Sequence, residues 1–174
     1  MRLFALLGPF ASGLPSLVRE LLELAYLFCY PLVPAGMGVL YAIGQRARAD
    51  SYWTLVLVSA FAAYSVLPWA GTRPPRTLEV MQEAARSRPR FFFQRVNLAV
   101  LARGSIQVNT FPSGHAASAW GVALFMTTVP GAAWVVFALF AFAIGVGAIA
   151  GRYHYGLDVV AGAGVAVAAF ALLP

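Results

Sequence analysis

Long apolar stretches separated by short polar segments constrain the fold of this chain more than any other feature. Hydrophobic residues make up 61% of the 174 residues and charged residues only 10%, with a mean hydropathy of +0.78. A soluble domain carries about 25% charged residues, so this composition excludes an ordinary soluble protein. A transmembrane helix needs about 20 apolar residues. The stretches that reach or approach that length are 21–43, 52–69, 116–129, 132–150 and 157–173.

The sequence therefore predicts an all-α fold, a polytopic membrane bundle of five or six transmembrane helices that forms one domain over residues 1–174. Residues 1–13 would be an interfacial stub or the remnant of a sixth helix. Pro31 and Pro34 predict a kink or a split in the first span. Glu20 and Glu23 are expected in the first turn of that span, where the helix dipole favours carboxylates.

An arginine-rich segment interrupts the apolar pattern. The chain has no lysine, and its 12 arginines against six acidic residues give a formal net charge of +6. Seven of these arginines fall between residues 71 and 103, where we expect an interfacial segment with a polar helix over 77–88 and an amphipathic helix over 91–103. The charge suits anionic partners such as lipid phosphates. Nucleic acid is not expected, because the arginines lie between spans without a reader motif.

Both histidines lie in polar segments at the edge of apolar stretches. His115 ends the sequence Phe-Pro-Ser-Gly-His, and His154 precedes Asp158 by four residues. On a helix this spacing puts His154 and Asp158 on one face, where the carboxylate can hold one imidazole nitrogen and leave the other free to attack. An ionisable pair beside a membrane helix is costly to bury, which favours a functional role over a structural one.

The order of the spans places the polar segments on one membrane face. The second span ends at the arginine-rich segment, the third begins after His115, and residues 151–156 separate the fourth from the fifth. The residues expected together on this face are Arg73, Arg76, Ser113, Gly114, His115, Arg152, His154 and Asp158.

Two histidines, a carboxylate and several arginines suit phosphoryl transfer. One histidine would attack phosphorus and form a phosphohistidine, while the other protonates the leaving oxygen. Arginines would neutralise the phosphate oxygens, and the amides of Ser113 and Gly114 at a helix start would add donors. No metal and no other cofactor is expected. A metal site on the histidines and Asp158 is the alternative, but the usual ligand spacing is missing.

Three motifs resemble the signatures of the type 2 phosphatidic acid phosphatase superfamily of membrane lipid phosphatases. FPSGHAA at 111–117 and RYHYGLDVVAG at 152–162 resemble its second and third signatures. TRPPR at 72–76 resembles the first, in the Pro-Pro-Arg form of the inositol phosphorylceramide synthase-like branch. The resemblance implies a helical membrane bundle with His154 as nucleophile, Asp158 as its partner and His115 as the acid.

By the same resemblance Arg76, Ser113 and Gly114 bind phosphate. The chain departs from the common signatures at two cations, since Val66 stands where a lysine is usual and Ala148 where an arginine is usual. We expect Arg73 and Arg152 to supply the missing charge.

The expected function is that of an integral membrane phosphatase acting on a lipid phosphate or diphosphate. One alternative is a lipid phosphotransferase that moves a phospho-headgroup to a hydroxyl acceptor. Another is a non-catalytic transporter of anionic lipids, which would use the arginines but leave the His–Asp pair unexplained. The oligomeric state stays open.

We expect the protein in the bacterial inner (plasma) membrane. A count of all arginines would put the site in the cytoplasm under the positive-inside rule. The rule is compromised where arginines bind substrate, and the resemblance implies a site on the periplasmic or lumenal side, where family members commonly have it. The expected location of the site is therefore the outer face.

Overall fold

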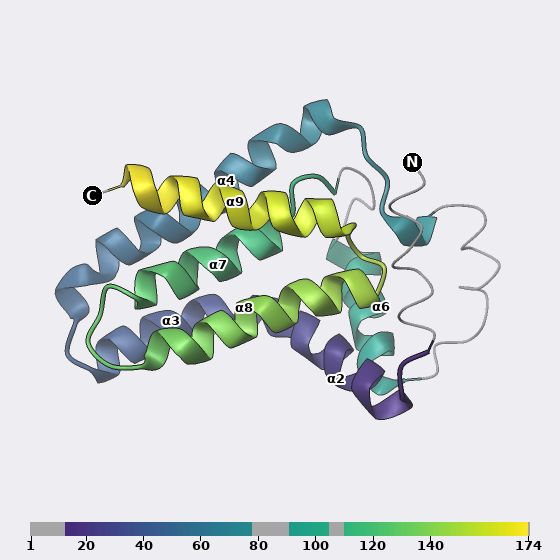
Figure 1. Cartoon of the computed structure of the whole chain (residues 1–174), viewed down its shortest axis with the longest axis horizontal. Helices are drawn as coiled ribbons and strands as arrows, with labels where there is room; N and C mark the ends of the chain where they lie inside the picture. The colour runs from purple at the N-terminus through teal and green to yellow at the C-terminus, as the bar shows by residue number, and fades with distance from the viewer. Residues whose placement is uncertain (1–12, 78–90, 105–109, 174) are drawn as a thin grey trace.

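The computed structural model describes residues 13–77, 91–104 and 110–173, and these residues form an all-helical bundle (Figure 1). The α-helices in these ranges are α2 (Ser16–Leu27), α3 (Cys29–Ala42), α4 (Ala49–Ala70), α6 (Phe92–Gly104), α7 (Gly114–Met126), α8 (Ala133–Ala150) and α9 (Gly156–Leu172). Two short 3₁₀ helices are η2 (Arg46–Arg48) and η3 (Pro75–Thr77). The predicted all-α fold is confirmed, and α6 matches the predicted helix over 91–103. Apart from Gly13 and Thr77, the predicted stub at 1–13 and the polar helix at 77–88 lie outside the described residues.

Helices occupy each of the five predicted spans, and they are compatible with an integral membrane protein. Two helical segments are long and apolar enough to cross a membrane, Arg46–Thr77 and Ala133–Ala150, and α2 with α3 qualifies as a third if the bent pair is one span. The apolar helix α9 is shorter, and α7 has only 13 residues. The predicted number of five or six crossings is therefore not confirmed.

The first predicted span is broken at Phe28. Helices α2 and α3 meet there at an angle of 59°. Pro31 lies in the first turn of α3 and Pro34 inside it, and each proline removes a backbone donor from the helix ladder. The predicted split is therefore confirmed.

The expectation about the two glutamates of this span is wrong. Helix α2 begins at Ser16, so Glu20 and Glu23 lie beyond its first turn, out of reach of the helix dipole. Their carboxyl groups instead contact other parts of the chain, as described below.

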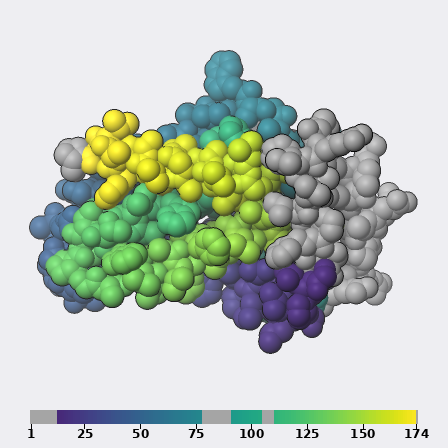
Figure 2. Space-filling model, viewed as in Figure 1, coloured from purple at the N-terminus to yellow at the C-terminus, as the bar shows by residue number. Residues whose placement is uncertain are grey.

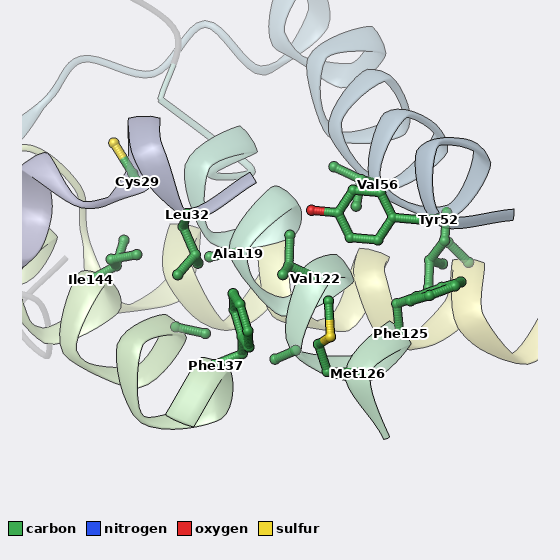
Figure 3. Packing of buried hydrophobic residues seen from close by; sticks show 14 of the residues in the cluster. Cys29, Leu32, Tyr52, Val56, Ala119, Val122, Phe125, Met126, Phe137 and Ile144 are labelled. Carbon is green, nitrogen blue, oxygen red and sulfur yellow. The ribbon is translucent and has the colours of Figure 1, made fainter. Parts of the chain in front are cut away.

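Helix α7 is the centre of the bundle. It packs against α9, α4, α8 and α3, and Figure 2 shows α9 lying along α7 and α8 on one face of the molecule. Small buried residues on α7 let its neighbours approach closely. Around them lies a core from several helices, including Leu32, Tyr52, Val122, Phe125, Met126, Phe137 and Ile144 (Figure 3).

An arginine fixes the loop before α4 at the end of the bundle that lies away from the predicted site. At one end Arg48 donates hydrogen bonds to the carbonyl and hydroxyl oxygens of Thr128, both at 2.7 Å, and its guanidinium lies 5.0 Å from the centroid of the Phe125 ring. These contacts fasten η2 to the end of α7. The loop between α8 and α9 lies at the opposite end (Figure 1), where the predicted site residues gather.

Gly162 determines how closely α9 can approach the start of α7. A methyl group added at Gly162 would overlap the carbonyl oxygen of Ser113 and lie 3.2 Å from the Cβ atom of Ala116. Beside this contact, the backbone N–H of Ser113 donates a hydrogen bond of 2.9 Å to the carbonyl oxygen of Asp158. A residue without a side chain is therefore needed where the two helices meet.

We expect Gly162→Ala to destabilise the protein, because overpacking at a close backbone contact costs about 1–3 kcal/mol. Gly164→Ala is the matched control on the same helix, since an added methyl group meets nothing within 4 Å there and alanine is the better helix former. Thermal unfolding in detergent measures both variants. Equal melting temperatures for the two would contradict the packing that we describe.

Candidate active site

Three polar segments are fastened together at the end of the bundle where α8 passes into α9. The hydroxyl oxygen of Thr72 accepts hydrogen bonds from the backbone N–H groups of Thr110, at 2.8 Å, and Phe111, at 3.1 Å. The backbone N–H of Arg76 donates to the carbonyl oxygen of Arg152 at 3.3 Å. With the Ser113–Asp158 bond, these contacts bring all three predicted motifs together.

The loop that carries His154 folds back onto the end of α8. The backbone N–H groups of Tyr153 and His154 both donate to the carbonyl oxygen of Ala148, at 2.9 and 3.2 Å. Arg152 adopts a positive φ of 60°, which is uncommon for a residue with a side chain. Because α9 begins only at Gly156, His154 lies before the helix and not on it. Helical spacing is therefore the wrong explanation for a pairing with Asp158.

His154 and Asp158 nevertheless lie side by side. Atom Nδ1 of His154 is 3.5 Å from Oδ2 of Asp158, with both side chains largely buried. Nδ1 has no hydrogen-bond partner among the described residues, and catalytic hydrogen bonds are often long until substrate binds. The same Oδ2 accepts the backbone N–H of Tyr155 at 2.9 Å. This capping contact at the start of α9 fixes the carboxylate beside the imidazole.

His115 lies in the first turn of α7 and faces His154. The centroids of the two imidazole rings are 6.2 Å apart and the ring planes meet at 64°. The rings of Tyr26 and Tyr30 each lie 5.8 Å from the His115 ring. The two histidines, 39 positions apart in the sequence, are thus placed where both can act on one phosphoryl group.

The predicted phosphate-binding arginines occupy different environments. The guanidinium carbon of Arg76 lies 5.3 Å from the centroid of the Tyr153 ring, and Nη1 is buried without a partner among the described residues. A buried guanidinium nitrogen without a partner is costly and fits an anion. Arg73 is exposed. Arg152 is partly buried and contributes its carbonyl oxygen to the backbone of Arg76.

Of the hydrogen-bond donors predicted at Ser113 and Gly114, one is already bonded within the protein. The Ser113 amide donates to Asp158, so it is not available to a phosphate. The Ser113 hydroxyl accepts the backbone N–H of Ala116 at 3.3 Å and caps the helix, while its own hydrogen can still be donated. The Gly114 amide belongs to the first turn, whose N–H groups have no partner within the helix.

The structure adds Glu23 and Tyr153 to the site, which sequence reasoning missed. The Tyr153 hydroxyl donates to Oε2 of Glu23 at 2.6 Å, and the side-chain amide of Asn97 donates to the same oxygen at 2.7 Å. Burial raises the pKa of Tyr153, so the phenol keeps the proton that it donates. The sequence feature that could have indicated this contact is Glu23 itself, an acidic residue within an apolar stretch.

The assembled groups are chemically able to carry out phosphoryl transfer. They comprise an imidazole beside a carboxylate, a second imidazole facing it and a buried guanidinium. Within residues 13–77, 91–104 and 110–173, no group of three or more histidine, cysteine, aspartate or glutamate side chains could hold a metal ion.

Comparison with known proteins identifies a family. A model of the PAP2 superfamily matches residues 10–172, a range that includes all three motifs. No curated protein and no solved structure matches the chain. Members of this superfamily are phosphatases or phosphotransferases, which supports a phosphoryl-transfer enzyme. From the match along nearly its whole length, the chain belongs to the PAP2 superfamily, the family that its three motifs resemble.

Proposed function

We propose that the protein is an integral membrane phosphatase that hydrolyses a lipid phosphate or diphosphate through a phosphohistidine intermediate. The observation that carries the proposal is the placement of His154 between Asp158 and His115, 3.5 Å from the carboxylate and 6.2 Å, ring to ring, from the second imidazole. The superfamily match supports phosphoryl transfer in general. The long apolar helices support a substrate that resides in a membrane.

In the first proposed step, Nε2 of His154 attacks phosphorus. The bond between phosphorus and the leaving oxygen breaks as the nitrogen–phosphorus bond forms, and His115 gives a proton to the departing oxygen. Asp158 retains the Nδ1–H tautomer of His154, which keeps the lone pair on Nε2. Arg76, the Ser113 hydroxyl and the Gly114 amide stabilise the charge on the phosphoryl oxygens.

In the second proposed step, water attacks the phosphohistidine. His115, now neutral, takes a proton from the water, and the nitrogen–phosphorus bond breaks to release phosphate and regenerate His154. The lipid alcohol or the shortened lipid phosphate leaves with its tail in the membrane. Arg73 and Arg152 are proposed to attract the anionic headgroup to this end of the bundle.

We expect His154→Ala to abolish phosphate release, because the proposed intermediate forms on its side chain. The assay follows phosphate release in detergent, with a chelator present, from a panel of lipid phosphates and diphosphates. The expected result is wild-type activity that survives the chelator and falls by at least about 10⁴-fold in the variant. Release that the variant retains would contradict the proposed nucleophile. If neither protein releases phosphate from any substrate of the panel, transfer to an absent acceptor or the transporter would be favoured.

We expect the effect of His115→Ala to depend on the leaving group. General acid catalysis contributes about 10²–10⁴-fold, so the variant should lose that much with a lipid phosphate whose leaving group is an alkoxide. With p-nitrophenyl phosphate, whose leaving group needs no proton, the loss should stay below about tenfold. Comparing kcat/KM for the two substrates tests the role. Equal losses would contradict His115 as the acid.

Transfer to a hydroxyl acceptor is the second candidate function, and one observation favours it. Arg76 is the last residue of the Pro-Pro-Arg form that resembles the inositol phosphorylceramide synthase-like branch. Its Nη1 is buried beside Tyr153 without a partner among the described residues. The two functions share the first step and differ in whether water or an alcohol attacks. The same panel with an added lipid alcohol separates them, because transfer yields a phosphorylated acceptor.

We propose that the site faces the outside of a bacterial plasma membrane. Arg46 and Arg48 lie at the end of the bundle away from the site, and Arg46 stacks on Tyr41 at 5.5 Å. Neither arginine is proposed to bind substrate. If this short loop between two apolar helices is taken as the orientation signal in place of the arginines of 71–103, the positive-inside rule puts η2 in the cytoplasm.

We expect a cysteine placed in η2, Ala47→Cys, to be shielded from a membrane-impermeant maleimide in intact cells and to react after permeabilisation. Trp69→Cys, at an exposed position near the site end of α4, should react in intact cells. The native Cys29 is buried and serves as the background control. The reverse labelling pattern would place the site in the cytoplasm.

A further inference from the structure

Helix α2 holds the ring of Tyr153 from two sides. Glu23 and Tyr26 are three residues apart and therefore lie on one face of α2. Glu23 accepts the hydrogen bond of the Tyr153 hydroxyl at 2.6 Å, and Tyr26 stacks on the Tyr153 ring with centroids 4.4 Å apart and an interplanar angle of 16°. The ring is thus fixed both at its hydroxyl group and across its face.

The carboxyl group of Glu23 is itself fixed in place. Its residue is only 7% exposed, and the Asn97 amide of α6 donates both to Oε2, at 2.7 Å, and to the Glu23 backbone carbonyl, at 2.9 Å. A buried carboxyl group is costly unless it is hydrogen-bonded. Close packing of α2 on α8 keeps it near Tyr153, since a methyl group added at Gly147 would overlap the carbonyl oxygen of Leu22.

Tyr153 connects this anchor to two predicted site residues. The guanidinium of Arg76 lies over its ring at 5.3 Å, a contact in which the ring attracts the cation. The backbone N–H groups of Tyr153 and His154 both donate to the carbonyl oxygen of Ala148. A displacement of Tyr153 would therefore disturb the arginine over its ring and, through the backbone, the next residue in the loop.

We propose that Glu23 is a positioning residue that, through its hydrogen bond to Tyr153, holds Arg76 and the His154 loop in the geometry that binds and attacks a phosphoryl group. The inference rests on the proposed function, in which Arg76 binds phosphate and His154 attacks it. Glu23 acts at a distance, because Tyr153 stands between it and the arginine.

The test uses variants that cut this connection with the smallest changes. Tyr153→Phe removes one oxygen atom and keeps the ring. Glu23→Met removes the acceptor, and Asn97 keeps its bond to the Glu23 backbone. The double variant removes the Tyr153 hydroxyl together with its acceptor, so that only the Asn97 amide hydrogen that faced Oε2 is left without a partner. Glu20→Gln is the matched control on the same helix, since Glu20 accepts the backbone N–H of Phe93 and belongs to the α2–α6 contact.

Three quantities are measured in detergent for each variant: kcat and KM for a lipid phosphate, the melting temperature, and the rise in melting temperature that inorganic phosphate produces. We expect Tyr153→Phe to lower kcat/KM by about tenfold, because a displaced Arg76 would stabilise the transition state less. It should also reduce the rise in melting temperature that phosphate produces. The double variant should regain the part of the melting temperature that Glu23→Met loses through the unpaired Tyr153 hydroxyl, but not the activity. Glu20→Gln should stay within about twofold of wild type in kcat/KM.

Testing Tyr153→Phe in an Arg76→Lys variant shows whether its effect passes through the arginine. Arg76→Lys keeps the charge but not the planar guanidinium that stacks on a ring. Adding Tyr153→Phe to Arg76→Lys should therefore reduce kcat/KM by much less than tenfold. Full additivity of the two changes, or activity that returns together with stability in the double variant, would reduce Glu23 to a structural role and overturn the inference.

The phosphate-dependent rise separates a failure of this inference from a failure of the proposed function. If the wild type releases no phosphate but is stabilised by phosphate, and Tyr153→Phe removes that stabilisation, the inference stands and hydrolysis fails. If the wild type is active and Tyr153→Phe matches it in both kcat/KM and phosphate response, hydrolysis stands and the inference fails. A wild type with neither property overturns both, because Arg76 would then have no phosphate to bind.

Discussion

The backbone hydrogen bond between Ser113 and Asp158 is the contact on which the rest of the site depends. It joins the turn before α7 to the first turn of α9 at 2.9 Å, and Gly162 leaves the space that it needs. His115 follows the donor by two residues, and the acceptor residue carries the carboxylate beside His154. Because donor and acceptor both belong to the backbone, the relative position of the two histidines depends on helix packing more than on any side-chain contact between them.

Much of the fold and the composition of the site follow from the sequence. Apolar stretches of membrane length predict the helices, and the order of those stretches predicts that the polar segments meet at one end. The prolines after Phe28 predict the break in the first span. These features depend on local composition and on connectivity, both of which one sequence contains. The number of membrane crossings is less accessible, because helices such as α7 and α9 are too short for composition alone to decide.

The parts that sequence reasoning got wrong depend on contacts between distant residues. His154 meets Asp158 because the loop folds onto the carbonyl oxygen of Ala148 with Arg152 at a positive φ, and the spacing of four residues does not encode that conformation. Glu23 contacts Asn97 and Tyr153, 74 and 130 positions further along the chain. No pattern within α2 identifies those partners, so a buried network of this kind emerges only when α2, α6 and the α8–α9 loop are assembled.

The bend at Phe28 has a consequence for how an amphiphile could occupy the bundle. Just past the bend, Tyr30 is 49% exposed while its ring meets the His115 ring edge to face. Tyr30 thus connects the His115 imidazole with the surface of the bundle. If the proposed lipid substrate binds at this point, its phosphate would turn inward to the histidines while its hydrocarbon chain stays among the lipids. In the proposed function, the broken helix would let a lipid approach the histidines from the side of the bundle, and the hydrocarbon need not enter the packed core.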